Sequence, residues 1–273
     1  MSIRVDGLSF GYNGRKVLED ISFEGRDDHI VSILGPNGVG KTTLLKCMCN
    51  ILRADAGAVS VDGEEINGMA RMEVAKRISY VPQRSAATRT TVFDSVLIGR
   101  RPHMSWSLTK KDMAITRDVI RAVGLGDLAM RNVDEISGGE FQKVQIARAM
   151  VQEAKVLVLD EPTSSLDVAN QHMVMRLLVD TVRKKRICTI MTMHDINLAA
   201  YCSDELMFMK GGRMIARGPP SIITGDLIRE VYGMEVKVIN HDGLPLVIPS
   251  LGDAHLLRHL DDRSLMPHEH RLK

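Results

Sequence analysis

The stretch "LGPNGVGKTTLLK" at residues 34–46 constrains the fold more than any other part of the sequence. It places three glycines and a proline within six residues, between an apolar run, "HIVSIL", and a segment with helical spacing. Each glycine loses more conformational freedom on folding than any other residue, so a buried core does not favour such a cluster. We therefore expect a loop between a strand and a helix whose backbone comes close to a ligand.

This loop matches the pattern G-x-x-x-x-G-K-[ST], which binds phosphates in nucleotide-binding proteins. Glycines let backbone N–H groups converge on an anion, and the positive end of the following helix dipole adds to the attraction. Lys41 is expected to reach the β- and γ-phosphates, and the Thr42 hydroxyl to hold Mg²⁺. The alternative, a chance glycine-rich turn, fits poorly with the strand before it and the helix after it. The expected phosphate-binding residues are Gly35, Pro36, Asn37, Gly38, Val39, Gly40, Lys41, Thr42 and Thr43.

Strand-like and helical segments alternate along most of the chain, which favours an α/β fold with a largely parallel sheet. Residues 3–33 have strand patterns, and a helix is expected from about Lys41 to Ile51 or Leu52. Between about Thr90 and Ala154 helical patterns dominate, which indicates a helical insert. Hairpins are expected in "GAVSVDGEEI", "ELMFMKGGRMIA" and "EVKVINHDGLPLVI", each with a turn that contains glycine.

Composition excludes some classes of function. The net charge of +2 gives no strong field for nucleic acid, and no basic stripe appears. The N-terminus has no signal-peptide pattern, and the apolar runs are too short to cross a bilayer. The four cysteines have no spacing typical of a zinc or disulfide framework, so we expect buried thiols: Cys47, Cys49, Cys188 and Cys202.

The segment "VLVLDEPTSSLD" carries a second set of candidate residues. Four aliphatic residues end at Asp160 and Glu161, and the carboxyl end of a buried strand is where ligands bind in sheets of this kind. Asp160 is expected to hold Mg²⁺, directly or through water. Glu161 is expected to orient or deprotonate an attacking water. A solvated turn is the alternative, and the phosphate loop in the same chain makes it the weaker interpretation.

The segment "ISGGE" at residues 136–140 opens an amphipathic helix, with Ser137 as a plausible N-cap. Exposed backbone donors at this helix N-terminus form a second candidate anion site. Taken alone, the segment is better explained as a loop and a capped helix.

Taken together, the three segments resemble the ATP-binding cassette of ABC transporters over residues 2–249. "ISGGE" resembles the family's LSGGQ signature, with Ile136 in place of Leu and Glu140 in place of Gln, while Ser137, Gly138 and Gly139 are kept. The resemblance implies a P-loop NTPase (RecA-like) core with a mixed sheet, an antiparallel β subdomain and an inserted α-helical subdomain. It places the core at residues 1–89 and 155–249 and the helical subdomain at 90–154, followed by a tail at 250–273.

The resemblance also implies that ATP is bound between two cassettes, so that the phosphate loop of one copy faces the signature, Ser137 to Glu140, of the other. The working unit is then a dimer. Tyr12 matches the aromatic residue that stacks on adenine, and Gln83 matches the glutamine that contacts Mg²⁺ and the γ-phosphate. Asp167 in "SSLD" matches the aspartate of the family's D-loop, and His194 matches the histidine that contacts the γ-phosphate.

Segments such as "VFDSVLIGRRPH" and "HDGLPLVIP" resemble cassettes of importers for ferric siderophores, haem and cobalamin. This finer resemblance implies an integral membrane permease dimer as partner, a substrate-binding protein that acts indirectly, and a location on the cytoplasmic face of the membrane. Residues from about Arg84 to His103 are expected to line the groove for the permease. The alternative is a soluble regulatory or DNA-associated cassette ATPase. A tail containing four histidines is expected to be loose and solvated, although metal binding is conceivable.

Overall fold

The computed structural model describes residues 2–104 and 107–250. Its strands are β1 (Ile3–Tyr12), β2 (Arg15–Gly25), β3 (Ile30–Leu34), β4 (Ala56–Val61), β5 (Glu64–Glu65), β6 (Ile78–Val81), β7 (Val156–Asp160), β8 (Cys188–Thr192), β9 (Glu205–Lys210), β10 (Arg213–Gly218), β11 (Val236–His241) and β12 (Leu244–Pro249). Its α-helices are α1 (Lys41–Met48), α2 (Arg71–Arg77), α3 (Val92–Leu97), α4 (Lys110–Ala122), α5 (Gly138–Met150), α6 (Val168–Lys185), α7 (Ile196–Cys202) and α8 (Gly225–Tyr232). Short 3-10 helices are η1 (Ile98–His103), η2 (Gly126–Leu128), η3 (Val133–Glu135) and η4 (Pro220–Ile222).

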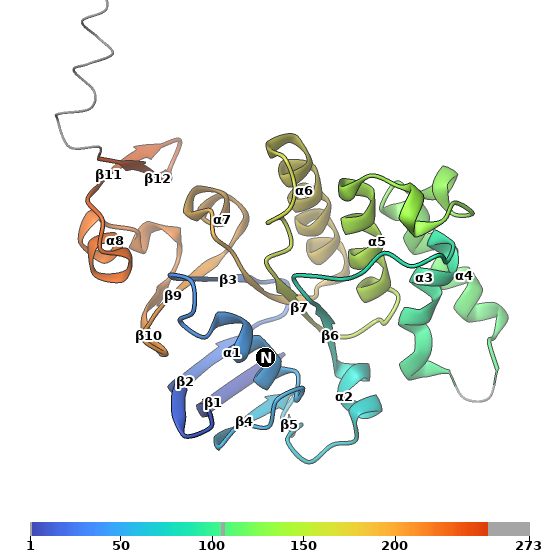
Figure 1. Cartoon of the computed structure of the whole chain (residues 1–273), viewed down its shortest axis with the longest axis horizontal. Coiled ribbons are helices and arrows are strands. Elements are labelled where there is room, and N and C mark those ends of the chain that lie inside the picture. The colour runs from blue at the N-terminus through green and yellow to red at the C-terminus, as the bar shows by residue number, and fades with distance from the viewer. Residues whose placement is uncertain (1, 105–106, 251–273) are drawn as a thin grey trace, which may run out of the picture.

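A six-stranded sheet forms the centre of the molecule, in the order β10-β9-β3-β8-β7-β6 (Figure 1). Its strands run parallel except β10, which returns antiparallel to β9. Strands β3, β7 and β8 are buried along their whole length. Helices cover both faces of such a strand, which explains why β7 reads as a continuous aliphatic run rather than an alternating one.

The two faces of the sheet belong to two separate cores. Val156 and Val158 of β7 pack in one core with α1 and the antiparallel sheet β2-β1-β4-β5. Leu157 and Leu159 pack in the other core, with α5, α6 and α7. Because successive side chains of a strand point to opposite faces, α1 and α5 lie on opposite sides of the sheet. Figure 1 shows them on either side of β7.

Between residues 90 and 154 the described residues form helices and turns, with one isolated β-bridge between Thr91 and Asn132. Together with the mixed central sheet and the four-stranded antiparallel sheet, this segment confirms the expected P-loop NTPase architecture. The three expected hairpins are also present, as β4–β5, β9–β10 and β11–β12.

Some local expectations were wrong. Helix α1 ends at Met48 rather than near Leu52, because Asn50 takes a left-handed conformation (φ 51°) that ends the helix, and Ile51 is 52% exposed. Helices α2 and α8 were not expected. Helix α8 has clear end signals, since Thr224 accepts a hydrogen bond from Leu227 N at its start and Gly233 is left-handed at its end.

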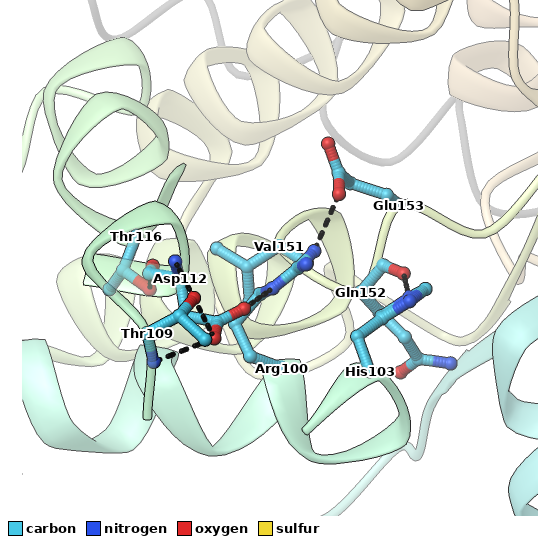
Figure 2. Close-up of polar contacts among 8 residues, drawn as sticks. All are labelled: Arg100, His103, Thr109, Asp112, Thr116, Val151, Gln152 and Glu153. Carbon is cyan, nitrogen blue, oxygen red and sulfur yellow. Dashed lines mark hydrogen bonds and ion pairs between the residues drawn. The ribbon is translucent and has the colours of Figure 1, made fainter. Parts of the chain in front are cut away.

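A buried ion pair fixes the position of η1 (Figure 2). Arg100 Nε donates to Asp112 Oδ1 at 3.0 Å, and both side chains are about 5% exposed or less. Arg100 also donates to Val151 O and to Glu153, each at 2.6 Å, just beyond the end of α5. The Arg100 side chain thus connects η1 with the start of α4 and with the residues that follow the end of α5. Asp112 in turn closes a capping box with Thr109 at the start of α4.

A loose C-terminal tail was predicted for residues 250–273. Residues 251–273 lie outside the described part of the chain. Among the described residues, no helix combines the length and the apolar character needed to cross a membrane.

Candidate nucleotide-binding site

The phosphate loop between β3 and α1 owes its glycines to two different causes. Gly35, Gly38 and Gly40 all have positive φ, at 149°, 77° and 104°. A Cβ on Gly35 would lie 2.3 Å from Met209 O, and one on Gly40 would lie 2.9 Å from Val17 O. A Cβ on Gly38 would meet nothing within 4 Å. The first and last glycines are therefore required by close packing against β9 and β2, and not only by room for a phosphate.

Lys41 lies buried under this loop, with 6% of its surface exposed. Its Nζ donates to Gly35 O at 2.6 Å and to Pro36 O at 3.1 Å. Burial lowers the pKa of Lys41, and the charges of Glu161 and Asp160 oppose that shift only in part. A buried ammonium that contacts only carbonyl oxygens gains from an anion, because desolvation of its charge is otherwise poorly compensated. This arrangement fits a bound phosphate chain.

Asp160 stands at the end of β7 with 2% of its surface exposed. Its Oδ1 accepts hydrogen bonds from Thr42 Oγ1 at 3.0 Å and Thr192 Oγ1 at 2.8 Å. Its Oδ2 accepts a longer bond from Tyr80 OH at 3.4 Å. Carboxylate and hydroxyl oxygens are the hard donors that Mg²⁺ prefers, and the ion is commonly held by one or two carboxylates together with phosphates. The pair Thr42 and Asp160 therefore fits the expected magnesium site.

Glu161 follows Asp160 in a left-handed conformation with φ 49°, which is uncommon for a residue other than glycine. Its backbone N donates to Thr192 Oγ1 at 2.9 Å. Its carboxylate contacts Gln83 Nε2 through one oxygen and His194 Nε2 through the other. The structure thus brings together three predicted residues that follow the neighbouring strands β6, β7 and β8.

Tyr12 lies at the tip of the β1–β2 hairpin, before a two-residue turn in which Asn13 and Gly14 both have positive φ. The tyrosine is 48% exposed and packs edge-to-face against Phe10 at 4.8 Å between ring centroids. Residue Val17 of the same hairpin packs against Gly40, so this hairpin adjoins the phosphate loop. An exposed aromatic face beside the loop is compatible with the stacking role that the resemblance implies.

The signature segment forms a closed capping box at the start of α5. Ser137 Oγ donates to Glu140 Oε2 at 2.7 Å, and Ser137 N donates to the same oxygen at 2.8 Å. These bonds from Ser137 lower the pKa of Glu140. Gly138 is open, whereas a Cβ on Gly139 would lie 2.7 Å from Asn170 Oδ1. In this chain the Glu140 carboxylate therefore already occupies two donors that the sequence assigns to phosphate.

The segment after Glu161 leads into α6 through Asp167, whose side chain accepts from Asn170 N at 2.8 Å as the helix N-cap. Hydrogen bonds from the backbone and the side chain of Asn170 lower the pKa of Asp167. Asn170 also lies against Gly139, so Asp167 and the signature are neighbours at the starts of α6 and α5. Among the described residues, no hydrogen bond or ion pair connects the signature segment, residues 137–140, with the phosphate loop.

Sequence reasoning missed Thr192 and Tyr80, which both bond to Asp160. A signal for Thr192 was present. It ends the strand next to β7, two residues before His194, and the parallel register pairs it directly with Asp160. Nothing in the sequence around Tyr80 distinguishes its hydroxyl from that of an ordinary strand tyrosine.

Comparisons with known proteins identify the family. The family model described as ABC transporter matches residues 18–164. An uncharacterized ABC transporter ATP-binding protein of Methanocaldococcus jannaschii is 44% identical over 249 residues, which cover 91% of this chain and 98% of that protein. The ferric enterobactin transport ATP-binding protein of Escherichia coli is 35% identical, over 90% of this chain and 93% of that protein. The cobalamin import ATP-binding protein of Halobacterium salinarum is 37% identical, over 87% of this chain and 60% of that protein.

Among solved structures, a chain of a metal-chelate type ABC transporter in an inward-facing conformation superposes with a TM-score of 0.80 at 26% identity. The match covers 91% of this chain and 97% of that one. The family match, the relatives and the geometry of the phosphate loop and acidic strand agree: the chain belongs to the ABC transporter family, as an ATP-binding ATPase subunit.

Proposed function

We propose that this chain powers an importer that takes up a metal chelate, namely a ferric siderophore, haem or cobalamin, through a membrane permease. Two relatives that it matches over at least 87% of its own length are named for ferric enterobactin transport and cobalamin import. A third, from Gloeobacter violaceus, is named for hemin import and is 34% identical over 94% of this chain. The ATPase subunit does not touch the cargo, so its residues do not show which of these three chelates is carried. The proposal therefore covers metal chelates as a class.

The observation that carries the proposed chemistry is the position of the Glu161 carboxylate, which lies between Gln83 and His194 just after the end of β7. A carboxylate held at both oxygens is oriented toward one position. There it accepts a proton from a water that attacks the γ-phosphate. His194 and Gln83 then contact the γ-phosphate, and Gln83 also contacts Mg²⁺. Lys41 neutralises charge on the β- and γ-phosphates.

Thr42, Gln83 and Asp160 would hold Mg²⁺. When bound, the ion neutralises part of the charge that develops on the phosphates. Asp160 is already oriented for this task by Thr192 and Thr42. The protein therefore does not need to reorganise its acid when nucleotide arrives.

The working unit is a dimer of cassettes. α1 and the signature helix α5 lie on opposite faces of the sheet, so one chain offers two half-sites that do not meet. In the dimer, Ser137, Gly138 and Gly139 of one copy cover the γ-phosphate held by the phosphate loop of the other. Nucleotide contacts both copies only in the closed arrangement, so it shifts the population toward that arrangement.

The proposal places the chain on the cytoplasmic face of the membrane, held there by a permease dimer, with a substrate-binding protein acting on the far side. Purification of the tagged chain from its own cell membranes tests this directly. We expect a permease with many spanning segments to co-purify. Uptake of labelled ferric siderophore, haem or cobalamin should be lost with Glu161→Gln. Co-purification of nucleic acid without a membrane protein would instead support the alternative, a regulatory or DNA-associated ATPase.

A further inference from the structure

The backbone that leads into His194 is fixed by the central sheet. Met193 N donates to Ile33 O at 3.1 Å, and Met193 is 2% exposed. This bond continues the parallel pairing of β8 with β3 by one residue beyond Thr192. At the next residue the chain leaves the sheet, and the His194 side chain contacts Glu161. One side of His194 therefore has a well-defined position.

The chain on the other side of His194 forms α7, which is too short to be stable by itself. Asp195 caps this helix by accepting a hydrogen bond from Leu198 N at 2.9 Å, and the helix ends after seven residues at Cys202. Isolated helices of fewer than about 12–15 residues are marginal in water. The direction in which α7 leaves His194 must therefore be set by contacts with other elements.

Asn197, in the first turn of α7, makes such a contact with the strand β12. Its Nδ2 donates to Val247 O at 3.1 Å, and its Oδ1 accepts from Val247 N at 2.8 Å. The amide thus pairs with both backbone groups of one residue, as a neighbouring strand would. The hairpin β11–β12 lies at the edge of the molecule, on the side of α7 and α8 (Figure 1). Neither Asn197 nor Val247 was given a role by the motifs or by the proposed chemistry.

The two bonds occupy the edge of β12 that faces away from β11. Val247 lies opposite Val238 in the hairpin, and both backbone groups of Val247 bond to Asn197 instead of to β11. The Val247 side chain is 8% exposed and belongs to the same core as Leu198 and Ala199 of α7. The last hairpin of the described chain is therefore joined to α7 by packing and by this pair of hydrogen bonds.

Helix stability does not explain an asparagine at position 197. Asparagine is a poorer helix former than alanine inside a helix. The N-cap position, which favours asparagine, is already occupied by Asp195. The gain that Asn197 brings is the pair of bonds to Val247, and this gain comes from a residue fifty positions further along the chain.

We propose that Asn197 is a positioning residue for ATP hydrolysis. By pairing with Val247 it fixes the first turn of α7, and thereby holds the His194 imidazole against Glu161. This role rests on the proposed function, which assigns His194 and Glu161 to the chemistry. The His194 side chain is 43% exposed, so its orientation depends on the backbone on either side of it. Asn197 follows His194 by three residues, which is less than one helical turn.

The position of Asn197 predicts an effect on the rate of hydrolysis rather than on nucleotide binding. A displacement of about 1 Å at a reacting group can cost up to about 10²-fold in rate. The phosphate loop, by contrast, packs against β9 and β2 through Gly35 and Gly40. Asn197 bonds to neither of these strands. Loss of its bonds should therefore lower kcat and leave the KM for ATP nearly unchanged.

The test measures steady-state ATP hydrolysis by the full-length chain. Asn197→Ala should lower kcat about tenfold, with a KM for ATP within about twofold of that of the unaltered chain. ATP and Mg²⁺ should raise the melting temperature of this variant as much as they raise that of the unaltered chain. Alanine is the better helix former, so weaker helix propensity would not account for a lower kcat.

Asn240→Ala is the matched control within the same hairpin. Asn240 Oδ1 accepts a hydrogen bond from Gly243 N at 2.9 Å in the turn between β11 and β12. This variant weakens the turn of the hairpin and leaves the pair of Asn197 with Val247 in place, so kcat should stay unchanged. A fall in kcat as large as that of Asn197→Ala would overturn the proposal, because any loosening of the hairpin would then be sufficient.

A double-mutant cycle with His194→Ala separates positioning from general stability. If Asn197 acts through His194, Asn197→Ala should cause no further loss of kcat in the His194→Ala background. A merely structural role would lower kcat by the same factor in both backgrounds, which would overturn the proposal. If Asn197→Ala does not fold, Asn197→Asp replaces it in the same cycle, since an aspartate can still accept the bond from Val247 N.

The outcomes also distinguish this role from the proposed function. If His194→Ala hydrolyses ATP as fast as the unaltered chain, the proposed chemistry fails, and the positioning role of Asn197 fails with it. If His194→Ala is strongly impaired while Asn197→Ala keeps full kcat, only the positioning role is overturned.

Discussion

The hydroxyl of Thr192 holds both acids of the nucleotide site in place. Its Oγ1 donates to Asp160 Oδ1 at 2.8 Å and accepts from the backbone N of Glu161 at 2.9 Å. This relation follows from the parallel register of β7 and β8, which places Asp160 opposite Thr192. One side chain on a neighbouring strand therefore orients the proposed magnesium ligand and supports the left-handed backbone of the proposed base.

Thr192→Val should reduce the ATPase rate about tenfold or more, because the shape is kept while both hydrogen bonds are lost. Stability should fall by about 1–3 kcal/mol, since Glu161 N is left without its partner. Thr189→Val is the matched control on the same strand. The Thr189 hydroxyl is buried and has no hydrogen-bond partner within residues 2–104 and 107–250, so this variant should keep full activity and equal or greater stability. Steady-state kinetics and urea unfolding measure both. Equal losses of ATPase rate and stability in the two variants would show that any change in this strand has the same effect, and would contradict a specific role for the Thr192 hydrogen bonds.

Lys41→Met should abolish the rise in melting temperature that ATP and Mg²⁺ produce in the unaltered chain. Without nucleotide, its melting temperature should be equal to that of the unaltered chain or higher. Burial lowers the pKa of Lys41, which means that the folded chain bears a cost for the charged form that Met removes. Thermal unfolding with and without nucleotide checks both parts. Undiminished ATP-dependent stabilisation would remove Lys41 from the phosphate site.

Glu140→Gln should lower the KM for ATP several-fold. The Glu140 carboxylate accepts a hydrogen bond from Ser137, next to which the proposed dimer places a γ-phosphate. The negative charges of the carboxylate and the phosphate would then repel each other. Glutamine can still accept the bond from Ser137 N, so the helix cap should persist and the melting temperature should change little. An unchanged KM would indicate that Glu140 turns away from nucleotide or that the signature does not meet it.

Asp112→Asn should destabilise the chain by about 3 kcal/mol at pH 7, because it removes the charge paired with buried Arg100. Bonds from Thr109 and Arg100 lower the pKa of Asp112 to about 2. An aspartate with a lowered pKa stabilises the folded state fully above its unfolded value of about 3.9 and loses that effect as the pH falls toward 2. The difference between the two chains should therefore narrow from pH 4 to pH 2. A constant difference over this range would contradict the ion pair.

Much of this site was predictable because its residues follow strands with strong local patterns. The aliphatic run of β7 places Asp160 and Glu161, and the phosphate loop has a fixed spacing that includes Lys41 and Thr42. Adjacent parallel strands then bring Gln83 and His194 to the same edge of the sheet. The placement of Lys41, Thr42, Asp160 and Glu161 needs only short-range information, whereas Gln83 and His194 were expected only from the resemblance to the family.

Other features depend on packing that the sequence does not reveal. The clash that excludes a side chain at Gly35 comes from Met209, which is far along the chain. The role of Thr192 depends on the exact register of two strands. Helix α2 was missed because it is short and has no side-chain cap at Ala70.

Joint binding of nucleotide by two copies of the chain is the central requirement of the proposed mechanism. Light scattering of Glu161→Gln, after size-exclusion chromatography with ATP and Mg²⁺, tests it most directly. The variant should hydrolyse ATP about 10²–10⁴ times more slowly, bind nucleotide normally and elute as a dimer, and addition of Ser137→Arg should return it to a monomer. A nucleotide-loaded variant that remains monomeric in solution and also in complex with its permease would contradict the account.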